Sequence, residues 1–158
     1  MGTAVTSTTS TADTVWLERL LLLLITTAFL ATLDQAVKHT VTAPAWTLHQ
    51  RSVLWFVGCC LILVAATPLA RVPSKTVAIA AGIFCGGVLG NLLSASEDGL
   101  QVPNPIVIGH ASGAVAFNVA DLCILGGNIL LMVSLIAVVI HNRDRLPVRA
   151  GLHLRRHR

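Results

Sequence analysis

Residues 115–140 read VAFNVADLCILGGNILLMVSLIAVVI, and this stretch contains a single charged side chain, Asp121. A helix needs about 20 mainly apolar residues to cross a hydrocarbon core that is about 30 Å thick. Three further apolar stretches of comparable length lie at about 17–37, 53–70 and 76–93. The sequence therefore predicts an all-α membrane protein, a bundle of four transmembrane helices.

The composition of the whole chain supports this interpretation. Its 158 residues are 54% hydrophobic and 11% charged, whereas a soluble domain has about 25% charged residues. The formal net charge of +4 would suggest a nucleic-acid partner, but six of the eleven Lys and Arg residues follow position 140. We therefore expect membrane lipid, and no nucleic acid, as a partner. The four cysteines lie in apolar runs without zinc-binding spacing, so we expect no metal and no cofactor.

The chain divides into three predicted parts. Residues 1–14 are rich in Thr, Ser and Ala and contain no Lys or Arg, which predicts a disordered leader. Residues 15–141 form the membrane domain, and residues 142–158 form a basic tail. Positive charges favour the cytoplasmic side, so the basic link at 71–75 and the tail are predicted to lie there. Both termini are then cytoplasmic, and the loop at 94–114 is external.

The third apolar stretch carries small residues at intervals of four, namely Ala78, Gly82, Gly86 and Gly90. This spacing lines them up on one helical face, where a neighbouring backbone can approach closely. Simple helix packing explains these glycines, whereas Gly87 lies off the stripe and is less easily explained by it.

Three acidic residues, Asp34, Asp98 and Asp121, lie in or beside the predicted spans, all near the external membrane surface. A charge at mid-bilayer costs about 2.5–3.5 kcal/mol on insertion scales, so such residues are functional candidates. Lys38 follows Asp34 by four residues, the favourable order for an ion pair on one helical face. Asn118 precedes Asp121 by three residues, so the amide and the carboxylate share a face. The simpler interpretations are an anchoring ion pair and a buried, hydrogen-bonded acid.

Three segments together resemble the lipoprotein signal peptidase family, also called signal peptidase II. They are Leu33-Asp34-Gln35-Ala36-Val37-Lys38 at the end of the first span, Gly86-Gly87-Val88-Leu89-Gly90-Asn91 at the end of the third, and Phe117-Asn118-Val119-Ala120-Asp121 entering the fourth. The resemblance implies a multi-pass protein of the bacterial cytoplasmic (inner) membrane with its active site near the external face. It also implies an intramembrane aspartic peptidase that cleaves the signal peptides of lipid-modified prolipoproteins.

The resemblance implies that Asp121 is one catalytic aspartate and that Asp34, Lys38, Asn91 and Asn118 bind substrate or support the site. Two carboxylates are needed, because one takes a proton from water while the other, protonated, polarises the scissile carbonyl.

The family pattern places the other aspartate after Asn91, at a position that Ser94 occupies here, so the pair is expected to be broken. Asp98, one helical turn further on, is the alternative source of the second carboxylate. The external segment at about 39–52 is also shorter than the loop that forms a small sheet-like cradle in the family.

Three functions therefore remain open. The first is a signal peptidase II. The second is a catalytically inactive pseudopeptidase that binds lipidated precursors or an inhibitor, which Ser94 and the short external segment favour. The third is a small proton-coupled transporter subunit that uses Asp34 and Asp121 as an ion path, although the spans lack the paired Gly or Pro interruptions of broken transporter helices.

Overall fold

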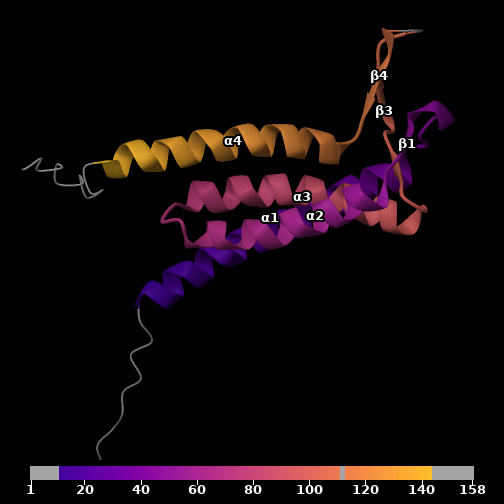
Figure 1. Cartoon of the computed structure of the whole chain (residues 1–158). Helices are drawn as coiled ribbons and strands as arrows, with labels where there is room; N and C mark the ends of the chain where they lie inside the picture. Colours follow the sequence, from indigo (N-terminus) through magenta and orange to yellow (C-terminus); the bar gives the residue numbers. More distant parts are fainter. Residues whose placement is uncertain (1–10, 111–112, 144–158) are drawn as a thin grey trace, which may run out of the picture.

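The computed structural model describes residues 11–110 and 113–143 and contains four long helices and two short pairs of strands (Figure 1). The helices are α1 (Thr11–Thr40), α2 (Val53–Ala66), α3 (Lys75–Glu97) and α4 (Val119–Asn142). A 3-10 helix, η2 (Thr67–Arg71), extends α2. Each of the four helical segments is long and apolar enough to cross a membrane. The predicted bundle of four transmembrane helices is confirmed.

The two terminal parts of the predicted division lie mainly outside the described residues. Residues 1–10 of the leader and residues 144–158 of the tail belong to that undescribed part. Helix α1 begins at Thr11, so the last residues of the predicted leader are helical.

The helix starts follow local sequence signals. Ser52 precedes α2, and its side chain accepts a hydrogen bond from the Trp55 amide at 3.1 Å. Ser74 caps α3 in the same way by accepting from the Val77 amide at 3.3 Å. Serine is favoured at this position because its hydroxyl satisfies an amide that has no acceptor within the helix.

Helix α3 is the centre of the bundle and packs mainly against α1 and α4. A Cβ atom added to Gly82 or Gly86 would collide with α1. A Cβ atom on Gly87 would instead collide with the Ala120 carbonyl oxygen at the start of α4. The glycine stripe therefore serves the α1 contact. Gly87 also serves helix packing, through a separate close approach to α4 that the sequence did not predict.

The outer faces of α1, α2 and α4 are apolar and exposed. Large aliphatic and aromatic side chains stand out from all three helices, among them Ile25, Phe29, Leu54, Leu125 and Ile129. A soluble protein does not expose this much contiguous apolar surface without a partner. Lipid contact explains this surface.

Two small antiparallel sheets lie at one end of the bundle (Figure 1). Strand β1 (Leu48–Gln50) pairs with β2 (Gln101–Pro103), and β3 (Ile106–Ile108) pairs with β4 (Val115–Phe117). The strands depart from the sequence prediction, which placed residues 115–117 in the fourth span. The short external segment also contributes β1 to a sheet, even though its length suggested that a sheet-like cradle is missing.

At the other end of the bundle, the start of α1, the link that follows η2 and the end of α4 lie together (Figure 1). Arg19 of α1 is buried there, and its guanidinium donates to the Val72 carbonyl at 2.6 Å. This hydrogen bond ties the link between α2 and α3 to α1.

Candidate active site

The first component of the site is a buried ion pair in α1. Asp34 is 0% exposed, and its Oδ2 lies 2.6 Å from Lys38 Nζ. The other oxygen, Oδ1, accepts a hydrogen bond from the Ala120 amide at 2.8 Å, so the carboxylate binds the start of α4. A Cβ atom on Gly90 would lie 2.7 Å from Asp34 Oδ2, so the missing side chain of Gly90 makes room for the carboxylate. The predicted ion pair within α1 is confirmed, and its Asp34 carboxylate also connects α1 to α4.

Lys38 and Gln35 extend the site to α3. Lys38 Nζ donates to Asn91 Oδ1 at 2.9 Å and to Ser94 Oγ at 3.1 Å. Gln35 Nε2 donates to the Gly90 carbonyl at 2.6 Å and to Ser94 Oγ at 3.2 Å. Ser94 is therefore inside the site, but its hydroxyl lies beside an ammonium group and an amide.

Asp121 lies at the start of α4 and takes part in a capping box. Asn118 Oδ1 accepts from the Asp121 amide at 2.8 Å, while Asp121 Oδ2 accepts from the Asn118 amide at 3.3 Å. Such reciprocal bonds satisfy two free amides at once. Asp121 Oδ1 also accepts from Asn91 Nδ2 at 3.1 Å. Both oxygens of this carboxylate are thus bound by neutral amide donors.

Asn104 is a site residue that sequence reasoning missed. It is buried, and its Oδ1 accepts from Asn118 Nδ2 at 2.6 Å. The same Asn118 nitrogen lies 3.0 Å from Asn91 Oδ1 and 3.2 Å from the Pro103 carbonyl, so its two hydrogens are shared among three acceptors. The one available signal was a polar side chain held between two prolines in the loop after the third span.

Asp98 does not join these residues. It lies at the C-terminal end of α3 and is exposed. Its backbone amide donates to the Ser94 carbonyl at 3.0 Å, but its carboxylate makes no hydrogen bond or ion pair with any described residue of the site. The neighbouring Glu97 is exposed as well and faces His39 at 4.0 Å.

We call the connected group of side chains from α1, α3, α4 and the β2–β3 link the polar cluster; its members are Asp34, Gln35, Lys38, Asn91, Ser94, Asn104, Asn118 and Asp121. The structure brings together every predicted site residue except Asp98. Within the described part of the chain, no three His, Cys, Asp or Glu side chains converge as metal ligands would. The cluster instead offers amide donors, carbonyl acceptors and one carboxylate without a cation, which suits recognition of a peptide backbone.

Comparison with known proteins identifies the architecture. Residues 42–137 match the family model described as signal peptidase (SPase) II. The chain belongs to the signal peptidase II family. The resemblance inferred from three short segments is confirmed, although the match begins after Asp34 and Lys38.

A solved structure described as a bacterial membrane enzyme, determined by the in meso method, shares the fold. Its TM-score is 0.59 at 16% sequence identity, and the alignment covers 82% of this signal peptidase II family chain and 94% of the other. Identity at this level shows the fold alone. A comparison with curated protein sequences gave no match.

Proposed function

We propose that this signal peptidase II family member is a pseudopeptidase, which binds the signal peptides of lipid-modified prolipoproteins without cleaving them. The observation that carries the proposal is the set of partners of Asp121: two neutral amides, from Asn91 and Asn118, and no second carboxylate from the described residues in hydrogen-bonding contact. Aspartic peptidases need two close carboxylates that share one proton. Asp34, the other buried carboxylate of the polar cluster, is held by Lys38 and the Ala120 amide instead.

The surroundings of the polar cluster support binding of an extended peptide. The Asn104 amide donates to the Thr47 carbonyl at 3.3 Å, which ties the cluster to the start of β1. Strand β1 belongs to a two-stranded sheet, so one of its edges has no strand partner among the described residues. An extended peptide can add to such an edge through backbone hydrogen bonds.

The distribution of positive charge supports one orientation of the protein in the membrane. Arg71 and Lys75 lie at the end of the bundle opposite the polar cluster. Positively charged ends favour the cytoplasm, which supports a location of the cluster near the external face of the bacterial cytoplasmic membrane. The lipid-modified precursors of the proposal emerge at that face.

The test is incubation of the purified protein in detergent with a lipid-modified prolipoprotein. We expect the wild type to retain the lipopeptide without cleavage, and Asp121→Asn to behave alike because the amide preserves the shape of the carboxylate. Cleavage by the wild type that Asp121→Asn abolishes would show an active peptidase and overturn the proposal. Failure of both proteins to retain the lipopeptide would overturn it as well.

Two gain-of-function variants sharpen the test. A carboxylate introduced by Ser94→Asp would lie beside Lys38 Nζ and form an ion pair with it, since the serine Oγ is 3.1 Å from this ammonium. A carboxylate introduced by Asn104→Asp would share Asn118 with Asp121 and has no cation among the described partners of Asn104. If either variant cleaves the lipopeptide, we therefore expect it to be Asn104→Asp and not Ser94→Asp. The double variant Asn104→Asp/Asp121→Asn is the control and should not cleave.

A further inference from the structure

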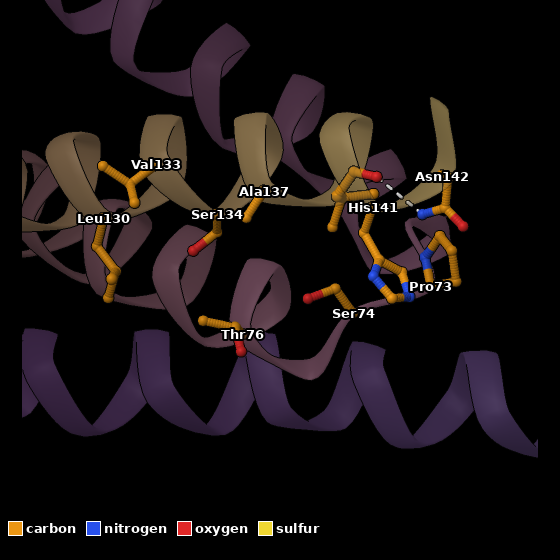
Figure 2. Close-up of a pocket in the computed structure, with 10 residues that line it drawn as sticks. Pro73, Ser74, Thr76, Leu130, Val133, Ser134, Ala137, His141 and Asn142 are labelled. Atoms are coloured by element: carbon orange, nitrogen blue, oxygen red, sulfur yellow. Dashed lines mark hydrogen bonds between the residues drawn. The ribbon is translucent and has the colours of Figure 1, made fainter. Parts of the chain in front are cut away.

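A second site lies at the end of the bundle away from the polar cluster. A pocket of about 570 Å³ opens between the start of α3 and the C-terminal half of α4 (Figure 2). Pockets of about 300–1,000 Å³ are typical of small-ligand sites. One wall is apolar and is formed by Leu130, Val133 and Val138 of α4. The facing wall is formed by Ser74, which caps α3, and by Thr76 in the first turn of that helix. The pocket is thus amphipathic.

Ser134 is an unsatisfied polar side chain in this pocket. The residue is 6% exposed, so it is more than nine-tenths buried. Its hydroxyl points from α4 toward α3 and into the pocket (Figure 2) and has no hydrogen-bond partner among the residues that the structure describes. A polar group in largely apolar surroundings gains from a hydrogen bond, so this hydroxyl is available to a ligand atom in the pocket.

The start of α3 supplies further donors on the facing wall. Lys75 and Thr76 are the first two residues of the helix, and their amides have no acceptor within it. The Ser74 hydroxyl accepts from the Val77 amide and so leaves those two amides free. Free amides and the positive end of the helix dipole together favour an anion.

The charged side chains around the pocket favour an anion too. His141 lines it, and Arg71 ends the 3-10 helix that leads into the link before α3. Lys75 is paired with Glu18 at 2.5 Å, and Asp13 is the other acidic residue of α1 at this end of the bundle. The sequence beyond position 143 adds five arginines and one aspartate, which makes this segment of the chain itself an unsuitable occupant for a site that favours anions.

We propose that this pocket binds an anionic phospholipid of the cytoplasmic leaflet. The phosphodiester lies at the start of α3 near His141, the Ser134 hydroxyl donates to an ester carbonyl, and one acyl chain follows Leu130 and Val133. The apolar wall distinguishes a lipid from a free phosphate, because Val133 is 58% exposed and continues the outer surface of α4. The proposal does not depend on the function of the polar cluster at the other end.

The test uses the delipidated full chain in an uncharged detergent, titrated with dioctanoyl phosphatidylglycerol and followed by native mass spectrometry. Ala137→Phe fills the pocket from an exposed position, and Ile136→Phe is the matched control, because Ile136 is 53% exposed and does not line the pocket. We expect at least about tenfold weaker binding in Ala137→Phe and no change in the control. Ser134→Ala should weaken binding about fivefold through loss of one hydrogen bond.

Two further ligands, dioctanoyl phosphatidylcholine and inorganic phosphate, are tested for binding in the same way. We expect the zwitterionic lipid to bind at least about fivefold more weakly, since basic residues near the surface favour anionic lipid. Equal binding of the two lipids, or unchanged binding by both Ala137→Phe and Ser134→Ala, would overturn the proposal. Displacement of the lipid by inorganic phosphate at a similar concentration would reveal a free-anion site and would overturn it too. If Ala137→Phe is not recovered folded, Ser134→Ala and Ala137→Leu provide the same comparison.

Discussion

The two ends of the bundle treat buried polar groups in opposite ways. In the polar cluster, the side chains of Asp34, Lys38, Asn91 and Asn118 bind one another and nearby amides. At the opposite end, the Ser134 hydroxyl and the buried Trp16 Nε1 have no hydrogen-bond partner within the described residues. Inside a membrane, polar groups must be satisfied by the protein or by something bound to it. The side chains of the cluster are therefore held by one another, whereas the Ser134 hydroxyl at the other end is left available to a ligand. The one exception near the cluster is Arg51 Nε, which is buried without a hydrogen-bond partner among the described residues.

The largest expected effect comes from removal of Asp34. Asp34→Ala leaves Lys38 buried without its counter-ion, which should cost about 3–5 kcal/mol of unfolding free energy. Glu18→Ala is the matched control, because it breaks the exposed ion pair with Lys75 at the other end, and such pairs contribute about 0–1 kcal/mol. Unfolding by sodium dodecyl sulfate in mixed micelles measures both. Equal losses would contradict the view that the stability of the cluster, and not that of the opposite end, depends on internal partners.

Asn118→Ala should give the next largest loss. It removes the cap of α4, worth about 1 kcal/mol, and it takes a donor from the buried Asn91 and Asn104 oxygens, each worth about 1 kcal/mol. The expected loss is about 3 kcal/mol in the same unfolding measurement. Ser52→Ala removes a cap at an exposed site with a single hydrogen bond, so it should lose only about 1 kcal/mol. If the two variants lose the same amount, the side chain of Asn118 contributes only as a cap.

Gly87→Ala tests the packing that positions the cluster. The new methyl group would meet the Ala120 carbonyl and the Ile124 amide, which are backbone atoms and cannot rotate away. We expect a loss of about 2 kcal/mol from the displacement of α4. Gly126→Ala is the control on α4 itself, because a Cβ there meets nothing within 4 Å. That variant should be neutral or stabilising by up to about 1 kcal/mol, and a similar loss in both would contradict the proposed contact.

Those features of the fold that depend on local sequence were predictable. The four spans follow from the length and hydropathy of single segments, and all four are present. The strands were not predicted, because each is three residues long and pairs with a distant segment, as β1 does with β2. A strand of three residues is too short for the alternation of apolar and polar residues, or for its composition, to distinguish it from a loop.

The same distinction holds within the site. The ion pair of Asp34 with Lys38 and the contact of Asn118 with Asp121 each lie within one helical turn, so spacing was enough to predict them. Asn104 enters the cluster through a contact across the loop that no spacing rule expresses. The role of Ser94 as the position of a lost aspartate remains a prediction from the resemblance, and the structure places its hydroxyl beside the Lys38 ammonium.

The smallest expected effect on stability is that of Ser134→Ala, and it tests most directly the contrast between the two ends of the bundle. In uncharged detergent, Ser134→Ala should match the wild type within about 0.5 kcal/mol or exceed it in stability, because the hydroxyl that it removes has no protein partner to lose. A ligand that binds only the folded state stabilises it in proportion to its affinity. Added phosphatidylglycerol should therefore stabilise the wild type more than the variant, in the same unfolding measurement. A loss above about 1 kcal/mol without lipid would mean that the hydroxyl already has a partner, and Ser134 would then not be available to a ligand.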